Sequence, residues 1–188
     1  VGVGNGMWAK RGTERGEVVR RRLGEQGFDV ICVTEGYAGV LPAGGHVIES
    51  DADYGYPIRE GRRKVLLWSR QPWRAVDAVG DRGMPGGRFV SGVTETGAGA
   101  LRVVGVCVPW DWAHVKTGRR DRRRWEDHLR YLEGLERYLA GLGERERAVV
   151  AGDFNQAVPR RRAPVRVYDS GSCRSGPRLE TVGAGPRP

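Results

Sequence analysis

The sequence predicts a layered α/β domain with a single compact core. Short runs rich in β-branched residues alternate with segments of helical period, in the order helix, several strands, helix, strand. Turns rich in glycine, proline and charged residues separate these runs. The 188 residues are enough for one domain that buries roughly two thirds of the surface its unfolded chain exposes.

Two segments show the helical period. Thr13 is a candidate N-cap for a helix whose apolar residues Val18, Val19 and Leu23 lie on one side. A second helix is expected from about residue 121 to residue 142. Its predicted apolar face consists of Trp125, His128, Leu129, Leu132, Leu135, Leu139 and Leu142.

The expected strands are short apolar runs at residues 28–33, 64–68, 88–94, 101–108 and 148–151. The first run leads into Glu35, and the last leads into Asp153. A carboxylate at the carboxyl end of a buried strand projects into the loops at the sheet edge, where ligands usually bind. If the two strands lie side by side, both carboxylates can hold a divalent cation such as Mg²⁺ through oxygen. Taken singly, each is more often a turn residue or a helix cap.

Two asparagines accompany these acids. Asn155 offers an amide that can donate to a phosphate oxygen while Asp153 accepts a hydrogen bond from an attacking water. Alternatively, Asn155 forms an Asx turn that shapes the loop. Asn5 lies among small residues near the N-terminus, where it marks either a short strand or a frayed end.

Positive charge dominates the composition. The chain has 32 Lys and Arg against 23 Asp and Glu, a net charge of +9, and nearly all of the cations are arginine. Arginine binds phosphate through two parallel hydrogen bonds, so nucleic acid or another phosphate ester is an expected partner. The alternative is an arginine-rich surface that is merely solvated.

Other features point to a reducing compartment. No apolar run approaches the roughly 18 residues of a membrane span, and the N-terminus lacks a signal-peptide pattern. Cys32, Cys107 and Cys173 do not form a disulfide or zinc pattern. We therefore expect a monomeric, cytoplasmic protein. Because the chain begins at Val1, we also expect it to be a segment or a processed product.

Several motifs together resemble the endonuclease/exonuclease/phosphatase superfamily, which includes DNase I-like nucleases. The family's first strand ends in Asn, as at Asn5, and its Asp-Val-Ile-x-Leu-Gln-Glu segment is similar to residues 29–35, with Thr34 in place of Gln. Its Gly-Asp-Phe-Asn motif is present in full at residues 152–155. Residues 65–72 resemble the family's strand followed by Ser-Arg-x-Pro. These weak signals occur in the order and spacing of the family.

The resemblance implies a DNase I-like α/β sandwich of two mixed sheets flanked by helices. It also implies a metal-dependent phosphoesterase, in which Glu35 and Asn5 bind Mg²⁺ or Mn²⁺, Asp153 orients the attacking water and Asn155 steadies the phosphate. Hydrolysis of phosphodiester bonds in nucleic acid is the expected activity. The alternatives are hydrolysis of lipid or small phosphate esters, and nucleic-acid binding without catalysis.

The chain departs from the family pattern at two places. Cys107 stands where relatives carry Tyr or His, and either His114 replaces that side chain or it is a surface or packing residue. The family's C-terminal Asp-His pair is also absent, since no Asp-His dipeptide follows Asn155. The dipeptide Asp127-His128 lies on the expected second helix and is interpreted as structural. We therefore expect a family domain at residues 1–165, without its last strands, and an incomplete or poorly ordered segment at 166–188.

An arginine-rich stretch precedes the second helix. Its arginines are Arg119, Arg120, Arg122, Arg123 and Arg124, and Trp110, Trp112 and Trp125 are close in sequence. His114, Arg119 and Arg120 are candidate phosphate-binding residues, with the tryptophans as platforms for bases. Alternatively, the tryptophans belong to the core and the arginines to a solvated face.

Overall fold

The computed structural model describes residues 1–144, 146–156 and 179–183. In this part of the chain, β1 (Gly2–Asn5), β2 (Val30–Tyr37), β4 (Arg62–Ser69) and β3 (His46–Glu49) form one sheet in that order. β1 is parallel to β2, and the other neighbours are antiparallel. This sheet is therefore mixed, as the family resemblance implies.

The second sheet is also mixed. Its order is β5 (Arg74–Asp77), β6 (Phe89–Thr96), β7 (Gly99–Cys107), β8 (Ala148–Asp153) and β9 (Leu179–Gly183). β5, β6 and β7 are antiparallel neighbours, whereas β8 runs parallel to both β7 and β9.

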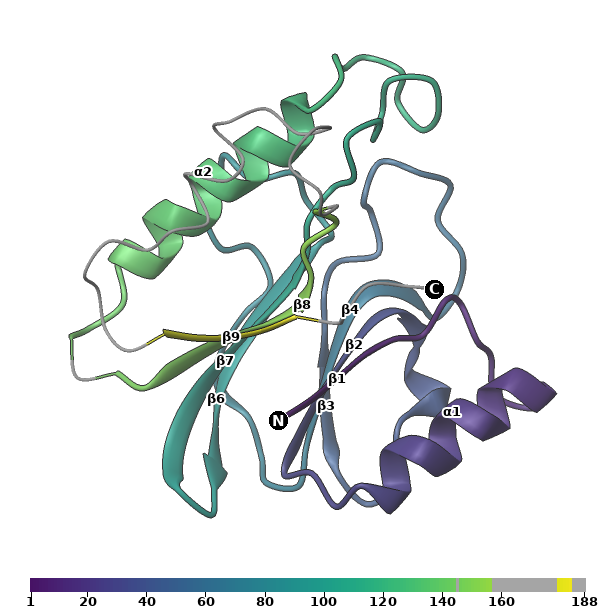
Figure 1. Ribbon diagram of the computed structural model, residues 1–188, viewed down its shortest axis with the longest axis vertical. Helices are drawn as coiled ribbons and strands as arrows, with labels where there is room; N and C mark the ends of the chain where they lie inside the picture. The colour runs from purple at the N-terminus through teal and green to yellow at the C-terminus, as the bar shows by residue number, and fades with distance from the viewer. Residues whose placement is uncertain (145, 157–178, 184–188) are drawn as a thin grey trace.

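The two sheets pack face to face between two helices, so that the domain has four layers (Figure 1). α1 (Glu14–Glu25) lies on the first sheet and α2 (Glu126–Ala140) on the second. An apolar cluster fills each of the three interfaces. Leu23 packs with Ile31 under α1, Cys32 and Val103 lie between the sheets, and Tyr131 packs on the second sheet under α2. Burial of these alternating strand residues is the main stabilising contribution.

The first helix begins as predicted. The Thr13 side chain accepts a hydrogen bond from the backbone N–H of Gly16 at 3.1 Å. The second helix begins at Glu126, several residues later than predicted, because Trp125 has a left-handed backbone with φ of 69°. The arginine-rich stretch is therefore a loop before α2 and not part of the helix.

Among the described residues, three strands were not predicted from the sequence. β3 and β5 are four-residue strands in which most side chains are half-buried or exposed, so they lack the apolar run on which a prediction depends. β9 falls within residues 166–188, the segment predicted to be incomplete or poorly ordered. The remainder of that segment lies outside the described residues.

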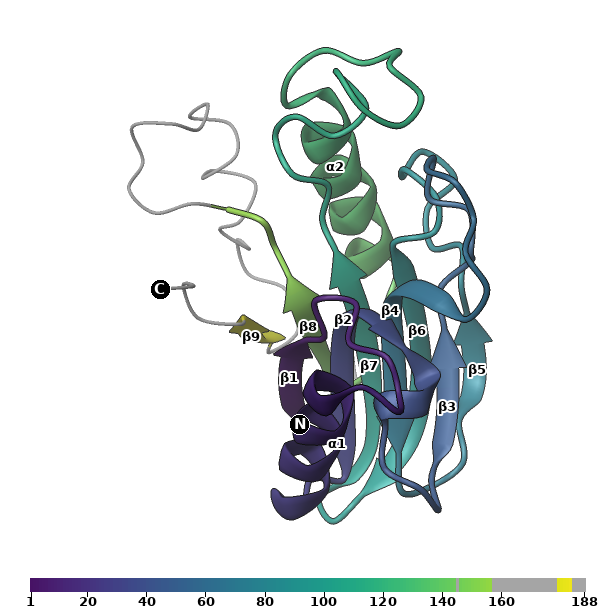
Figure 2. The ribbon, with the colours of Figure 1, turned by 90° about the vertical axis from the view of Figure 1, so that its right-hand side faces the viewer.

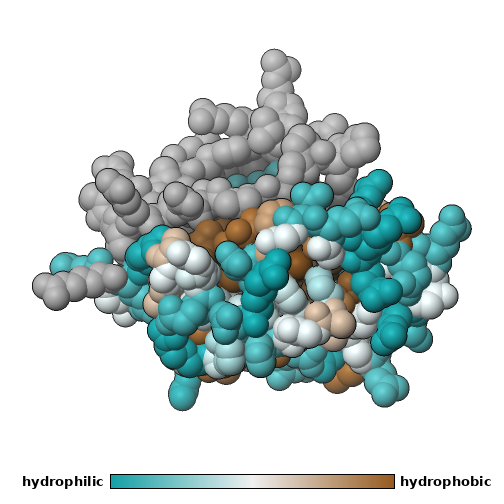
Figure 3. All heavy atoms as spheres, turned by 90° about the horizontal axis from the view of Figure 1, so that it is seen from below, coloured by the Kyte–Doolittle hydropathy of each residue, from teal (hydrophilic) through white to brown (hydrophobic). Residues whose placement is uncertain are grey.

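The described part of the face seen from below is largely polar. Hydrophilic residues dominate it, with apolar areas between them (Figure 3). No helix among the described residues is long and apolar enough to cross a membrane.

Candidate active site

The ends of strands from both sheets meet at one place. β1 and β8 are neighbours across the two sheets (Figure 2), and the Asn5 amide nitrogen donates a hydrogen bond to Asp153 Oδ2 at 3.0 Å. Asn5 is also the register partner of Thr34 on β2, next to Glu35. The structure therefore brings the predicted site residues Asn5, Glu35 and Asp153 together. We call Asn5, Glu35, Lys64, Asp153 and Asn155 the strand-end cluster.

Glu35 is held in an unusual conformation. β2 continues past its predicted end to Tyr37, but Glu35 adopts a φ of 51°, in the left-handed region. Such a conformation costs a non-glycine residue about 1–3 kcal/mol and is concentrated at functional sites. The Lys64 ammonium, on the neighbouring strand β4, donates to Glu35 Oε1 at 2.7 Å. Lys64 was not predicted as a site residue. A lysine at the start of a buried apolar strand is unusual, and this position could have marked it as a candidate.

The Gly-Asp-Phe-Asn loop fixes the Asp153 carboxylate. Gly152 has a φ of 149°, and a Cβ there would lie 1.9 Å from the Val106 carbonyl oxygen, so only glycine fits. The backbone N–H of Asn155 donates to Asp153 Oδ1 at 2.9 Å. The Asx turn is thus made by Asp153 and not by Asn155. Each Asp153 oxygen thus accepts one hydrogen bond and keeps the capacity for another, for example from a water.

Asn155 itself is held by a hydrogen bond to the residue that follows β7. It has a φ of 48°, and its amide nitrogen donates to the Val108 carbonyl oxygen at 2.8 Å. An amide NH₂ has two hydrogens, so the second one is available to a phosphate oxygen. The hydrogen bond to Val108 means that Asn155 also stabilises the loop.

The donor set of the cluster suits a hard divalent cation. Glu35 offers carboxylate oxygen, and Asn5, on the neighbouring strand β1, offers an amide oxygen that accepts from Met7 N–H at 2.8 Å. Mg²⁺ and Mn²⁺ prefer such oxygen ligands and usually keep several waters. Within the described residues, no group of three or more His, Cys, Asp and Glu side chains is placed to bind a metal. A metal in this cluster would therefore depend on few protein ligands and would share Glu35 with Lys64.

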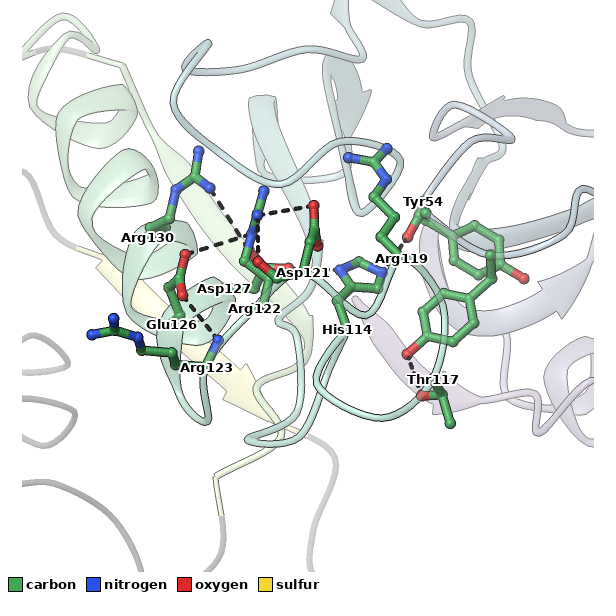
Figure 4. A network of polar contacts seen from close by, with 12 residues as sticks. Tyr54, His114, Thr117, Arg119, Asp121, Arg122, Arg123, Glu126, Asp127 and Arg130 are labelled. Carbon is green, nitrogen blue, oxygen red and sulfur yellow. Dashed lines mark hydrogen bonds and ion pairs between the residues drawn. The ribbon is translucent and has the colours of Figure 1, made fainter.

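His114 lies in a buried polar network on the loop between β7 and α2 (Figure 4). Its Nδ1 is 2.6 Å from Asp127 Oδ2, its Nε2 is 3.1 Å from the Tyr54 carbonyl oxygen, and its side chain is 4% exposed. Arg122 Nε donates to the other Asp127 oxygen at 2.9 Å. Because both ring nitrogens are engaged inside the protein, the geometry is that of a packing residue. A phosphate-binding role for His114 stays a prediction.

The Asp127 carboxyl is ionised more easily than usual. Burial acts to raise its pKa, but the hydrogen bonds from His114 and Arg122 outweigh burial and lower the pKa below 3.8. The hydrogen bond between Arg122 and Asp127 also raises the pKa of Arg122. The next residue, His128, is also buried and donates from Nδ1 to the Pro109 carbonyl oxygen at 2.6 Å. The described contacts of Asp127-His128 are therefore structural, as predicted.

The arginine-rich loop is only partly available to a ligand. Arg119 is half-exposed and lies 3.7 Å from Asp53, and Arg120 is exposed. Arg124 contacts the rings of Trp112 and Trp125 and forms an ion pair with Asp111, whereas Trp110 is exposed. Part of this loop is therefore packed against the protein, and part of it is exposed to solvent or to a ligand.

Aromatic rings connect this loop to the strand-end cluster. Trp8 stacks on Tyr54, with ring centroids 6.3 Å apart. The centroids of Tyr54 and Tyr56 are 5.7 Å apart, and those of Tyr56 and His114 are 4.9 Å apart. The Lys64 ammonium lies 5.0 Å from the Trp8 ring and 5.1 Å from the Tyr54 ring. The sequence did not reveal this row, because its members are separated by up to about a hundred residues.

The position that departs from the family pattern is apolar. Cys107 is the register partner of Asp153, and its side chain is buried in the core between the sheets. Burial raises the pKa of its thiol to about 11. A neutral thiol is a weak hydrogen-bond donor, so Cys107 does not replace the Tyr or His of the family pattern.

The four-layer arrangement of two mixed sheets and two helices is the DNase I-like fold, and solved structures share it. The endonuclease domain of TRAS1, a telomere-specific non-LTR retrotransposon, matches with a TM-score of 0.56 and 16% identity, over 89% of this chain and 67% of its own. D. rerio TDP2, complexed with a single-strand DNA product, matches with a TM-score of 0.60 and 11% identity, over 90% of this chain and 63% of its own. Sphingomyelinase C from Streptomyces griseocarneus matches with a TM-score of 0.54 and 14% identity. The match covers 89% of this chain and 66% of its own.

The family model agrees with these structures. The model of the endonuclease/exonuclease/phosphatase family matches residues 4–184, and the chain belongs to this family. The match extends beyond residue 165, the predicted domain boundary. The chain spans 63–67% of the length of the three structures named above. No curated protein sequence matches this chain.

Proposed function

We propose that this chain hydrolyses phosphodiester bonds in nucleic acid with the help of a divalent metal ion. The observation that carries the proposal is the hydrogen bond between Asn5 and Asp153, which joins the two sheets beside Glu35. Family membership supports phosphate-ester chemistry, and the net charge of +9 supports a polyanionic substrate. The DNA product in the TDP2 structure adds support for nucleic acid.

The residues of the strand-end cluster have separate tasks in this proposal. Asp153, held by two N–H donors, accepts a hydrogen bond from the attacking water and orients it toward phosphorus. Asn155 donates its second amide hydrogen to a phosphate oxygen, where negative charge develops. A divalent ion such as Mg²⁺ or Mn²⁺, held by Glu35 and Asn5, supplies Lewis-acid polarisation of the phosphoryl group when bound.

Cleavage assays on supercoiled plasmid and on abasic-site DNA in Mg²⁺ test the proposal. We expect Asp153→Asn and Glu35→Gln each to lower the cleavage rate by about a hundredfold or more. Glu49→Gln is the matched control, because Glu49 lies on the edge strand β3 of the same sheet as Glu35 and is paired with Arg63. Equal cleavage rates for the wild type, Asp153→Asn and Glu35→Gln would rule out the proposed site.

The likeness to sphingomyelinase C favours a second candidate function, hydrolysis of a phospholipid headgroup or a small phosphate ester. The same strand-end cluster would carry that reaction. Hydrolysis of such esters while DNA stays intact would favour it over the nuclease. Salt-sensitive DNA binding with no turnover of any ester would instead identify a non-catalytic member of the family.

A further inference from the structure

Arg88 is a buried cation without a counter-charge in the described structure. It directly precedes β6, is 2% exposed, and is the largest fully buried side chain among the described residues. Its Nε is buried and has no hydrogen-bond partner among the described residues. The described residues also place no carboxylate within ion-pair distance of its guanidinium. Lys64, the other buried cation nearby, differs because it is paired with Glu35.

Arg88 belongs to the same region as the strand-end cluster. Its carbonyl oxygen accepts hydrogen bonds from Cys107 N–H at 2.9 Å and from the Tyr131 hydroxyl at 2.7 Å. Cys107 is in turn the register partner of Asp153. These contacts place Arg88, Cys107 and Asp153 side by side at the ends of three adjacent strands.

The guanidinium approaches the row of aromatic rings. Its Cζ lies 5.9 Å from the centroid of the Tyr54 ring, the ring that Lys64 also contacts. A cation–π contact at this distance is near its limit of about 6 Å, and it satisfies none of the N–H groups. Tyr54 therefore does not replace a counter-ion.

An unpaired guanidinium in this position is unfavourable. Arginine stays protonated at any pH at which the protein is folded, so it cannot lose its charge as a buried lysine does. A buried charge with no partner is costly, whereas an oxyanion of matching geometry accepts two parallel hydrogen bonds from a guanidinium. Glu35 in the strand-end cluster is 22% exposed, so this cluster is open to solvent.

We propose that Arg88 binds a tetrahedral oxyanion of the phosphate class, and that it does so without a metal ion. The proposal rests on the proposed function, since the oxyanion is either a phosphoryl group of the substrate or free phosphate. Arg88 is then a phosphate-anchoring residue contributed by the second sheet, whereas Glu35 and Asn5 are contributed by the first. The anion also stabilises the fold, because it neutralises the buried charge.

The test compares Arg88→Met with Arg102→Met in buffer that contains EDTA and chloride as the only anion. Met keeps most of the apolar volume of the arginine stem. Arg102, on β7, is a half-buried arginine that is paired with Glu146 at 2.5 Å, so its substitution removes a cation that has an internal partner. The dissociation constant for inorganic phosphate is measured by calorimetry, and the melting temperature is measured with and without phosphate.

For Arg88→Met, we expect phosphate binding to weaken by about tenfold or more. Its melting temperature without phosphate should equal or exceed that of the wild type, because an unpaired charge has been removed. Arg102→Met should show the opposite: a lower melting temperature and unchanged phosphate binding. A fall in the melting temperature of Arg88→Met as large as that of Arg102→Met, or unchanged phosphate affinity, would overturn the proposal.

Arg88→Lys provides a second test that preserves the charge. Lysine lacks the planar fork, so phosphate affinity should fall, and affinity equal to the wild type would refute the bidentate site. An oligonucleotide that displaces phosphate from the wild type in EDTA assigns the anion to the substrate, whereas simultaneous binding assigns it to free phosphate. These measurements need no turnover, so their outcome is independent of whether the chain cleaves DNA.

Discussion

Replacement of Asp127 by Asn should destabilise the fold by removing the charge at the centre of a buried network. The Asp127 side chain is 4% exposed and accepts hydrogen bonds from His114 at 2.6 Å and Arg122 at 2.9 Å. It ties the loop between β7 and α2 to the first turn of α2. Asn has the same size but only one acceptor oxygen and no charge.

The expected magnitude follows from the burial of each partner. Removing one member of a buried charge pair costs about 3–5 kcal/mol. The Arg122 side chain is 22% exposed, so water replaces part of its lost interaction, and Asn keeps one acceptor. We therefore expect Asp127→Asn to lower the free energy of unfolding by about 2–3 kcal/mol at pH 7.

The loss should depend on pH in a defined direction. The pKa of Asp127 is lower in the folded state than its ordinary value of 3.8. Its ionised form therefore contributes stability that is fully present above pH 3.8 and is lost as the pH falls through the folded-state pKa. The difference between wild type and Asp127→Asn should be constant from pH 7 to about pH 5 and should shrink below pH 3.8.

Urea unfolding followed by tryptophan fluorescence measures these free energies. Asp121→Asn is the matched control, because Asp121 pairs with the same Arg122 at 3.1 Å but is 48% exposed. An exposed pair contributes about 0–1 kcal/mol, so the control should lose little stability. Equal losses for Asp127→Asn and Asp121→Asn would refute the reasoning, as would a loss for Asp127→Asn that does not shrink in acid.

Three further predictions concern single residues. Gly152→Ala should destabilise the fold by about 3 kcal/mol or more, because of the positive φ and the close Val106 oxygen; a thermal melt with a loss under about 1 kcal/mol would contradict this. Burial lowers the pKa of His128 below 6.5, so wild-type stability should fall as the pH drops below 6.5, by up to about 1.4 kcal/mol per pH unit. His128→Asn should flatten that slope in urea titrations, and an unchanged slope would exclude His128 as its source. Lys64→Met should tighten Mn²⁺ binding about tenfold in electron paramagnetic resonance titrations, since the ammonium no longer competes for Glu35; weaker binding would contradict the competition.

Much of the architecture was predictable because it depends on local patterns. Short apolar runs rich in β-branched residues identified β2, β4, β6, β7 and β8, and the Thr13 cap located the start of α1. These features depend on the burial of whole strands and on the hydrogen bonds of a helix N-terminus. The short edge strands β3 and β5 have no such run and were missed.

The candidate site was predictable only in part. The motifs around Glu35 and Asp153 indicated carboxylates at strand ends, because buried strands end where their apolar runs end. The pairing of β1 with β2 and the contact of β1 with β8 then brought Asn5 between them. A partner 148 residues away in the chain leaves no local pattern in the sequence.

The sequence by itself determined the family, the layered fold and the residues of the Gly-Asp-Phe-Asn loop, because each depends on short-range order. Only the tertiary structure decided the charges around them. It paired Lys64 with Glu35, enclosed His114 with Asp127, and left Arg88 buried without a carboxylate among the described residues. Ion pairing and burial depend on which strands and loops meet in space, and that is set by the packing of the whole core.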